Sequence, residues 1–480
     1  MSILRITMGV MAALAAGGAV AYWSGVRMEW DGTGSRPMLK YGTRTTHDED
    51  LERNRALQKK SQEPAGEEPA PPPAADAKPA APAPQRQPEA ASSPGDAYWA
   101  DFRGPGRLGV YAQTPILTAW PAAGLRRLWK QPAGGGYASF VVAHNLAYTI
   151  EQRRENEVVA AYDLATGRER WTNPWPGDFR ESMGGDGPRA TPVWHQGRVY
   201  AMGAEGELRV IDARTGTTVW RKNILSDNGA RNLEWGMAAS PLVVDGLVVV
   251  QPGGSNGRSI VAYNKESGER VWSALDDKQA YTSPVMMELA GKRQIVAVTA
   301  QRVVGLDPAG GALLWEFPWR TEYDVNSAQP LPVGPASFFI SAGYGHGAAL
   351  VEVAAQGAGW QARKAWSNNR MKNKFNSSVL YEGYLYGLDE GILSCMDVRT
   401  GAQMWKGGRY GFGQLLLASG HLVVITEEGE LALVKAAPES HQELARFEAI
   451  QGKTWNNPAI SNGILLVRNT TEMAAFRIGP

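Results

Sequence analysis

Two runs of apolar residues joined by a glycine-centred turn recur between residues 98 and 480. Copies occupy residues 191–200, 240–249, 377–386 and 457–466. Runs of this length, rich in Val, Leu, Ile and Tyr and bounded by turn residues, predict an antiparallel β-hairpin. The first three hairpins are each followed by a third strand and then by a fourth that carries an aromatic residue. The pattern therefore predicts units of four antiparallel strands, which is the blade of a β-propeller.

A second motif leads from the third strand to the fourth in five of these units. Its members share Asp or Asn, then Gly four positions later, then Trp four positions after that. The copies are Asp163-Gly167-Trp171, Asp212-Gly216-Trp220, Asn264-Gly268-Trp272, Asp307-Gly311-Trp315 and Asp397-Gly401-Trp405. Asp or Asn accepts hydrogen bonds from the amides of a turn, and Gly supplies the positive φ that closes a hairpin. Trp on the outer strand can then fill the space between neighbouring sheets and bury about 200 Å².

The aromatic residues of the fourth strands give the number of blades. They are Trp129, Trp171, Trp220, Trp272, Trp315, Trp366, Trp405 and Phe447, at intervals of 39 to 52 residues. Three strands at 457–478 lack a fourth, and the segment around Trp129 is a fourth strand without a blade. Pairing these segments closes the ring and removes the exposed edges of an open sheet. We therefore expect an all-β, eight-bladed propeller closed by both ends of its chain.

The first 97 residues follow a different pattern and divide into two segments. Residues 6–26 carry no charge, and a helix of that length rises about 30 Å, enough to cross a membrane. We assign 1–27 to a signal-anchor or, alternatively, to a signal peptide cleaved after Ala19-Val20-Ala21. Residues 28–97 are first charged and then rich in Pro and Ala, which predicts a disordered linker. The propeller, 98–480, is then expected on the periplasmic side of a bacterial cell envelope, or secreted if the segment is cleaved.

Charge and cysteine content narrow the choice of function. Lys and Arg number 49 against 48 Asp and Glu, so the chain lacks the basic excess of proteins that grip nucleic acid nonspecifically. The single Cys395 excludes an intrachain disulfide and any multi-cysteine zinc or iron–sulfur site. We therefore expect no nucleic-acid partner and no metal bound through cysteines.

The turn motif and the start of the propeller carry a family resemblance. The segment from Ala161 to Trp171 resembles the tryptophan-docking repeat of the PQQ-like, quinoprotein-type eight-bladed propellers. Residues 98–109 are similar to the Trp-Pro-x-Phe-Arg-Gly-Pro signature of a bacterial branch of these proteins. The resemblance covers about 98–478 and implies the eight-bladed fold. The family includes quinone-dependent dehydrogenases as well as the non-catalytic outer-membrane assembly factor BamB.

The resemblance leaves two functions to compare. Catalytic members typically hold their quinone beneath two adjacent cysteines and bind Ca²⁺ through Glu, Asn and Asp, whereas Cys395 here has no neighbour to pair with. The interpretation that we favour is a membrane-tethered, BamB-like scaffold, a monomeric propeller that binds protein partners in the envelope without a cofactor. The alternative is a PQQ- and Ca²⁺-dependent dehydrogenase that oxidises an alcohol or a sugar.

The candidate site lies at the entrance of the propeller funnel, on residues just before each innermost strand. Those expected there are Arg189, Glu234, Trp235, Tyr281, Asp324, Asn326, Lys374, Asn376, Trp455 and Asn456, with Tyr137 and Phe412 completing the ring. They would form a polar and aromatic cup for a ligand or a peptide segment, or simply cap the ends of strands. Glu234, Asp324 and Asn326 also carry the oxygen ligands that a hard cation prefers. We assign no catalytic residue and no metal site from the sequence.

Overall fold

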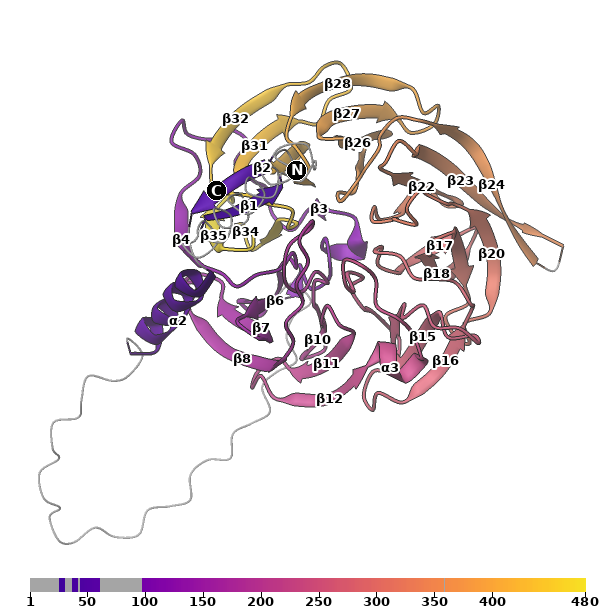
Figure 1. The fold of residues 1–480 in the computed structure, drawn as a ribbon. Coiled ribbons are helices and arrows are strands. Elements are labelled where there is room, and N and C mark those ends of the chain that lie inside the picture. The colour runs from indigo at the N-terminus through magenta and orange to yellow at the C-terminus, as the bar shows by residue number, and fades with distance from the viewer. Residues whose placement is uncertain (1–25, 31–36, 42–43, 61–96, 358) are drawn as a thin grey trace, which may run out of the picture.

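The computed structural model describes residues 26–30, 37–41, 44–60, 97–357 and 359–480. The uncharged segment up to residue 25 and the Pro- and Ala-rich stretch at 61–96 lie outside the described residues. In the described part, eight antiparallel sheets of four strands surround a common axis, and one sheet gains a fifth strand (Figure 1). The all-β, eight-bladed propeller is therefore confirmed.

The first four blades follow one another along the chain, each with its strands ordered from the axis outward. Blade 1 contains β5 (Val141–Ala143), β6 (Leu146–Arg153), β7 (Asn156–Asp163) and β8 (Glu169–Pro176). Blade 2 contains β9 (Val193–His195), β10 (Arg198–Met202), β11 (Glu207–Asp212) and β12 (Thr218–Asn223), followed by the short helix α3 (Ile224–Asn228). Blade 3 contains β13 (Leu242–Val244), β14 (Leu247–Val250), β15 (Ile260–Asn264) and β16 (Arg270–Ala274). Blade 4 contains β17 (Val285–Leu289), β18 (Lys292–Val298), β19 (Arg302–Leu306) and β20 (Leu313–Pro318).

The other four blades complete the ring. Blade 5 contains β21 (Leu331–Pro332), β22 (Ser337–Ala342), β23 (Gly347–Gln356) and β24 (Gly359–Asn368). Blade 6 contains β25 (Val379–Tyr381), β26 (Tyr384–Asp389), β27 (Ile392–Asp397) and β28 (Gln403–Arg409). Blade 7 contains β29 (Gln414–Ala418), β30 (His421–Ile425), β31 (Glu430–Lys435) and β32 (Glu443–Glu448). Blade 8 contains β33 (Ala459–Ser461), β34 (Ile464–Arg468), β35 (Glu472–Arg477) and, as its outermost strand, β4 (Arg127–Pro132).

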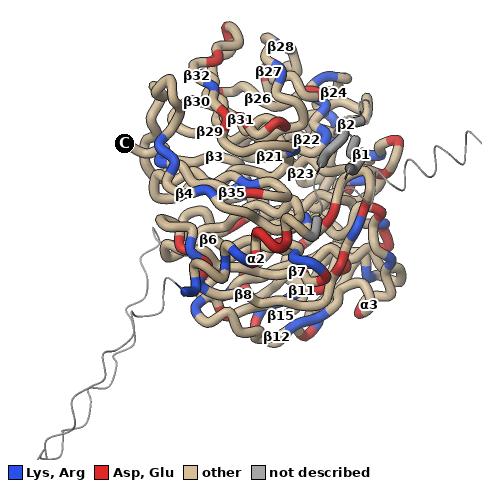
Figure 2. The backbone as a smooth tube through the Cα atoms, turned by 60° about the vertical axis from the view of Figure 1, so that its left-hand side comes forward, with Lys and Arg blue, Asp and Glu red and all other residues tan. Residues whose placement is uncertain are grey.

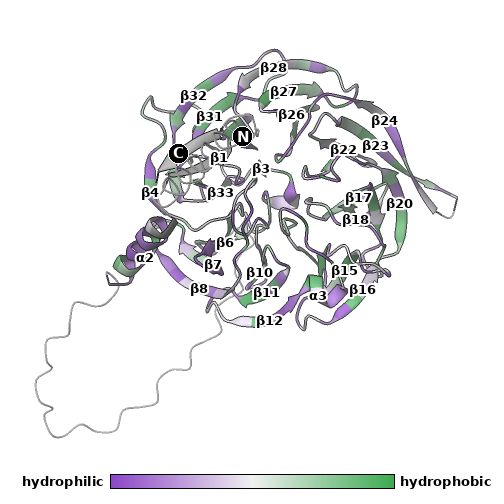
Figure 3. Cartoon of the chain, in the orientation of Figure 1, coloured by the Kyte–Doolittle hydropathy of each residue, from purple (hydrophilic) through white to green (hydrophobic). Residues whose placement is uncertain are grey.

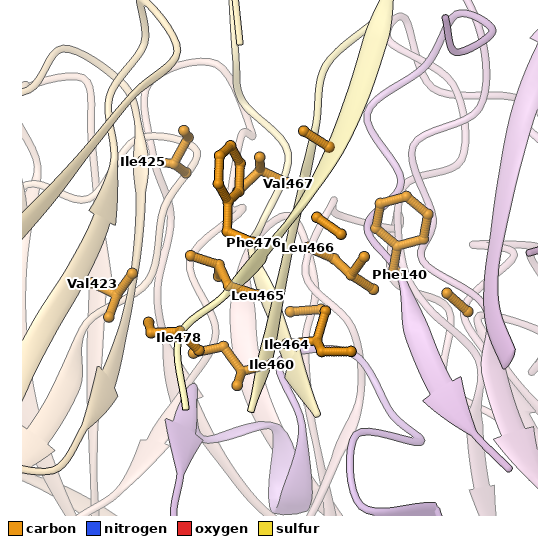
Figure 4. Close-up of a cluster of buried hydrophobic side chains, with 14 of the residues drawn as sticks. Phe140, Val423, Ile425, Ile460, Ile464, Leu465, Leu466, Val467, Phe476 and Ile478 are labelled. Atoms are coloured by element: carbon orange, nitrogen blue, oxygen red, sulfur yellow. The ribbon is translucent and has the colours of Figure 1, made fainter. Parts of the chain in front are cut away.

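Blade 8 closes the ring with strands from both ends of the propeller. Strand β35 pairs antiparallel with β4, so that Glu472 lies opposite Pro132 and Ala475 opposite Trp129. Apolar side chains of the three C-terminal strands pack against those of blade 7 on one side and blade 1 on the other (Figure 4). The predicted pairing of 457–478 with the segment around Trp129 is present in the structure.

The burial pattern explains why the middle strands read as continuous apolar runs. Residues in the middle of β7, β11 and β31 are buried on both faces because each blade is covered by its two neighbours. Outermost strands such as β8 and β24 alternate and face solvent on one side, and Figure 3 shows them as the more hydrophilic ones. The hydrophobic cores therefore lie between blades.

Tryptophans of the outermost strands join consecutive blades in a regular way. The indole of Trp171 in blade 1 lies against Gly216 in the turn of blade 2, and its Nε1 donates to the carbonyl of Ala213 at 2.9 Å. The same contact is made by Trp129, Trp220, Trp272 and Trp366 with the turns at Gly167, Gly268, Gly311 and Gly401. Each Trp thus contacts the turn of the following blade, and the Asp or Asn of that turn accepts amide hydrogen bonds within it.

Trp315 differs from the other motif tryptophans. Its Nε1 donates to Gln294 of its own blade, and its ring stacks on Phe338 of blade 5 at 5.5 Å. Blade 5 has the long hairpin β23–β24 where the other blades have a short turn between their third and fourth strands. The motif identifies the residue, but the partner depends on the next blade.

The first residues of the propeller fill one end of its axis. This axial plug, residues 98–111, includes the 3₁₀ turn η2 (Pro105–Arg107) and β3 (Val110–Tyr111), which lie near the centre of the ring in Figure 1. Strand β3 adds in parallel to β29, and Trp99 forms a β-bridge with Val142 of β5. The plug therefore contacts blades 7 and 1, the two neighbours of the closing blade.

The structure differs from the expected linker within residues 28–97. It contains the two-stranded sheet of β1 (Val26–Trp30) and β2 (Pro37–Tyr41) and the helix α2 (Arg44–Lys60), which packs against the side of the propeller beside β4 and β8 (Figures 1 and 2). On α2, Leu51 is buried, and Arg55 donates to Gln131 and to the carbonyl of Pro132. The charged sequence of residues 44–60 gave no sign of a packed helix, because a helix can dock through a single buried face while its other faces are charged. No helix in the described part is long and apolar enough to cross a membrane.

Candidate functional site

The predicted site residues lie in the segments that lead into the innermost strands. Backbone contacts connect these segments from blade to blade. The amide of Tyr137 donates to the carbonyl of Pro188 at 2.8 Å, and the amide of Tyr281 donates to that of Asn326 at 3.0 Å. Across the closure, Asn456 Nδ2 donates to the carbonyl of Ala138 at 2.9 Å. The segments therefore share one end of the axis.

Aromatic side chains gather at this end, and we call them the axial aromatic cluster. Its members are Tyr137, Trp235, Tyr281, Tyr344, Phe375, Phe412 and Trp455. The ring centroid of Trp455 lies 5.2 Å from that of Tyr137 and 4.8 Å from that of Phe375. Phe375 belongs to blade 6 and Trp455 to blade 8, so this contact reaches past blade 7. All members except Phe412 remain half-buried, so the cluster is partly open to solvent.

Lys374 lies among three of these rings. Its Nζ is 4.6 Å from the ring centroid of Phe412, 4.9 Å from Tyr344 and 5.2 Å from Phe375. An ammonium over aromatic faces is attracted by their quadrupoles, by about 0.5–2 kcal/mol per contact. Burial lowers the pKa of Lys374, and the negative charge of Glu427 acts against that shift.

Two further cations belong to the same end of the axis. The guanidinium of Arg189 lies 4.9 Å from the ring of Phe179 and 5.6 Å from that of Tyr137, and burial lowers its pKa. Lys453 Nζ lies 4.5 Å from the ring of Trp455 and donates to the carbonyl of Gly184 at 3.0 Å. Cations thus alternate with aromatic rings around the axis.

Glu427 orients part of the cluster. Its Oε1 accepts from the indole of Trp455 at 2.8 Å, and its Oε2 accepts from the amide of Phe412 at 3.1 Å. Glu427 is not among the residues predicted from the sequence, where it follows β30 in the acidic pair Glu427-Glu428. That position gives no signal for its indole partner in another blade.

The three residues considered for a hard cation have other surroundings. Asp324 pairs with Lys278 at 3.5 Å and with Arg320 at 3.6 Å. Asn326 is 2% exposed and donates through Nδ2 to the carbonyl of Thr299 at 2.9 Å, while Glu234 is exposed. Among the described residues, no group of three or more His, Cys, Asp or Glu side chains could hold a metal ion.

The position of Cys395 likewise does not suit a residue that covers a quinone. It lies in β27, is fully buried between blades, and burial raises the pKa of its thiol to about 12. The ion pairs of Asp324 and the buried position of Cys395 do not fit the calcium ligands and cysteine pair that the dehydrogenases use. We therefore derive no reaction step through a quinone.

A layer of buried amides lies beneath the aromatic cluster. Gln414 Nε2 donates to the carbonyls of Phe375 at 3.0 Å and Trp455 at 2.9 Å, which ties blades 6 and 8 together through blade 7. Asn376 and Asn456 follow those two residues and are each 1% exposed. Asn376 Nδ2, Asn456 Oδ1 and Gln414 Oε1 have no protein hydrogen-bond partner among the described residues. The layer therefore offers free donors and acceptors at the axis.

Two arginines of the axial plug reach the start of the innermost strands. Arg107 donates to the carbonyls of Pro284 at 2.7 Å and Pro241 at 2.5 Å and pairs with Asp101 at 2.9 Å. Arg103 donates to the carbonyl of Ser378 at 3.0 Å, and burial lowers its pKa to about 10. Both are 3% exposed. The sequence showed that both arginines lie at the start of the propeller, but it did not show that they bond to the segments before β13, β17 and β25.

The sequence of this chain is similar to those of known proteins. The family described as outer membrane protein assembly factor BamB matches residues 106–173 and 154–407. BamB of Bordetella pertussis is 23% identical over 305 residues, which covers 62% of this chain and 72% of that protein. BamB of Yersinia pestis is 21% identical over 308 residues and is covered to 75%.

Dehydrogenases are matched over shorter stretches. The quinohemoprotein alcohol dehydrogenase ADH-IIG of Pseudomonas putida is 28% identical over 134 residues, which covers 27% of this chain and 17% of that protein. Among solved structures, BamB from Moraxella catarrhalis aligns with a TM-score of 0.51 at 15% identity, over 74% of this chain and 98% of that one. The quinohemoprotein alcohol dehydrogenase of Comamonas testosteroni aligns with a TM-score of 0.58 at 13% identity, over 80% of each chain. These structural likenesses show the shared fold.

Proposed function

The chain belongs to the family of the outer membrane protein assembly factor BamB, and on that premise we propose that it is a non-catalytic scaffold of the bacterial cell envelope. In this proposal the N-terminal segment tethers the protein to a membrane. The propeller lies on the periplasmic side as a monomer and binds protein partners through its surface.

The observation that carries the proposal is the extent of the two kinds of relationship. BamB relatives are aligned over 72% and 75% of their own length, so most of the ring is compared. The alcohol dehydrogenase is aligned over 17% of its length, which corresponds to a few shared repeats. Similarity over a few repeats indicates a shared fold, whereas a shared function requires the same functional site.

The exposed chemistry at the axis supports binding of a protein. Tyr, Trp, Phe and Arg are enriched at protein interfaces because large, partly rigid side chains bury much area for little loss of entropy. The axial aromatic cluster presents six half-buried rings beside Arg189 and Lys374. The aromatic rings and Arg189 are of the residue types that anchor a partner.

The proposal is tested on the full chain, expressed with an affinity tag in the envelope of a Gram-negative bacterium. We expect the propeller to be cleaved by added protease only after the outer membrane is opened. Crosslinking should give a defined complex with an outer-membrane assembly protein. Cytoplasmic fractionation, or recovery of the propeller without any crosslinked partner, would contradict the proposal.

The dehydrogenase alternative is tested on the same purified protein. PQQ and Ca²⁺ are added, and reduction of an artificial electron acceptor is followed with alcohols and sugars as substrates. We expect no turnover above that of the protein without substrate. Stoichiometric PQQ binding with sustained turnover would replace the scaffold by the enzyme.

A further inference from the structure

Helix α2 lies across the closing seam, which is the place where β4 of blade 8 adjoins β7 and β8 of blade 1 (Figure 1). On the side of blade 8, Gln58 Nε2 donates to Gln131 Oε1 at 2.7 Å. On the side of blade 1, Gln58 Oε1 accepts from the amide of Glu169 at 3.0 Å, and Arg55 Nε lies 3.3 Å from Glu169 Oε2. Helix α2 therefore bridges the last and the first blade of the ring.

The contact is made through one narrow face of the helix. Among the side chains described on α2, residues 46–60, only Leu51 and Arg55 are buried. Gln58 follows three positions after Arg55, so these three side chains lie on the same face. An isolated helix of this length is marginally stable in water, and one that buries only two side chains opens more easily than the middle strands of the blades.

The groups of the ring that Arg55 contacts also have partners within the ring. Gln131 Nε2 donates to a backbone carbonyl in the turn of blade 1 at 2.8 Å, and Glu169 pairs with Arg153 at 2.6 Å. The hydroxyl of Tyr162, which Arg55 reaches at 3.3 Å, also accepts from Arg153 at 2.8 Å. Departure of α2 therefore leaves none of these groups without a partner, and it leaves the pairing of β35 with β4 intact.

The length of chain between α2 and the ring gives this contact a consequence. Helix α2 ends at Lys60, and residues 61–96 connect it to the propeller. A chain of that length spans at most about 120 Å. While α2 is docked, its end is fixed on the ring, so this span adds nothing to the distance between the N-terminal segment and the propeller. Once α2 is released, the span becomes available.

We propose that the closing seam is a docking site that binds and releases α2 of the same chain, and that this exchange sets how far the propeller can stand from its N-terminal tether. With α2 docked, the ring is held next to the chain that leads to the membrane. With α2 released, the ring stays closed and gains the reach of residues 61–96. The reach rests on the tether of the proposed function, whereas the docking and release of α2 do not depend on it.

Hydrogen exchange of the full chain in detergent tests whether α2 leaves while the ring stays closed. We expect the amides of residues 44–60 to exchange at least about a hundredfold faster than those of β7, because only the contacts of α2 need to break. They should exchange faster still in Arg55→Met and in Leu51→Ser, which each remove one buried contact and leave the ring unaltered. The proposal would be overturned if the amides of α2 exchanged as slowly as those of β7, or equally fast in the parent and in both variants.

Spin labels on the full chain measure the reach. They are attached at Leu57→Cys on α2 and Val219→Cys on β12, whose native side chains are 61% and 43% exposed, whereas the native Cys395 is fully buried. Distances between the labels should form one narrow peak in the parent. In the two variants with a weakened face, a broad peak at longer distances should grow at least about fivefold. Arg53→Met, at a side chain that is 69% exposed, is the control and should keep the narrow peak. A narrow peak in every variant would overturn the proposal.

The outcomes separate this inference from the proposed function. If the propeller proves to be untethered in the envelope while the labels still move apart in the variants, the tether fails and the docking site for α2 stands. If the propeller is tethered and α2 exchanges its amides only together with the ring, the tether stands and the exchange of α2 fails.

Discussion

The contact between each Trp and the turn of the next blade can be tested at Gly216. An alanine there would place its Cβ 2.7 Å from Cδ2 of Trp171, at a backbone φ of +75°. Two penalties therefore act on Gly216→Ala, one from the backbone and one from the ring. They can be separated with Gly197 of the same blade, whose φ is +77° and whose added Cβ would meet no heavy atom within 4 Å.

The expected losses of stability of the two variants differ only in what happens to the indole of Trp171. A left-handed conformation costs an alanine about 1–2 kcal/mol relative to glycine, and this is all that Gly197→Ala should lose. Gly216→Ala must in addition displace the indole of Trp171 from a filled interface, which costs about 1–3 kcal/mol. That movement also strains the Nε1 bond to the carbonyl of Ala213, worth about 1 kcal/mol. We therefore expect a total loss of about 3–6 kcal/mol for Gly216→Ala.

Urea unfolding of the two variants and the parent protein provides the measurement. The midpoint should fall slightly for Gly197→Ala and several times further for Gly216→Ala. A third variant, Trp171→Phe with Gly216→Ala, should recover part of the loss because the smaller ring leaves space for the Cβ. Equal losses in the two glycine variants would refute the argument that the indole is held against the turn.

Three further predictions concern buried charges. Burial raises the pKa of Glu157 to about 7, so the folded state holds this proton more tightly than the unfolded chain does. The stability that comes from the tighter proton binding is complete below about pH 4.5. It is lost as the pH rises to 7, and the loss amounts to about 3 kcal/mol. Urea midpoints of Glu157→Gln at pH 5 and pH 8 should therefore differ less than those of the parent, and an unchanged difference would contradict the assignment. Arg107→Met should lower stability by about 2–4 kcal/mol, because it removes the plug's bonds to blades 3 and 4 and leaves Asp101 without its partner; Arg293→Met, at a pair more than half exposed, is its control and should have little effect. Arg55→Met should release α2 from the ring and speed tryptic cleavage within residues 44–60, whereas the 69%-exposed Arg53 can be changed without that effect.

Local patterns predicted the blades because their signals are local. Each blade is formed by residues close together in sequence, so apolar runs, turn glycines and the interval between outer-strand aromatics were enough to predict it. The pairing of the two end segments followed from counting the strands. The same logic failed for Trp315, whose partner depends on the hairpin of the following blade. It also missed α2, where Arg55 pairs with Glu169 of blade 1, far along the chain.

The positions of the candidate site residues were easier to predict than their surroundings, and their role in binding stays a prediction. Counting back from each innermost strand located Arg189, Trp235, Tyr281, Lys374 and Trp455, because the propeller fixes which segments meet at the axis. Asp324 forms ion pairs with Lys278 and Arg320, and its position in the sequence does not indicate these partners. Gln414, the first residue of an otherwise apolar strand, has no sequence feature that reveals its bonds to two other blades.

The closure through β4 also sets an order of events during synthesis of the chain. Gly134, just after β4, accepts a hydrogen bond from Arg468, a partner 334 residues further along the chain. Until β33–β35 have emerged, β4 has no sheet to join and the axial plug has no complete ring around it. A chain cut short before blade 8 would still contain β29, the partner of β3, but it would leave β4 without a sheet to join and prone to aggregate. The ring can therefore close only after its last blade has been synthesised.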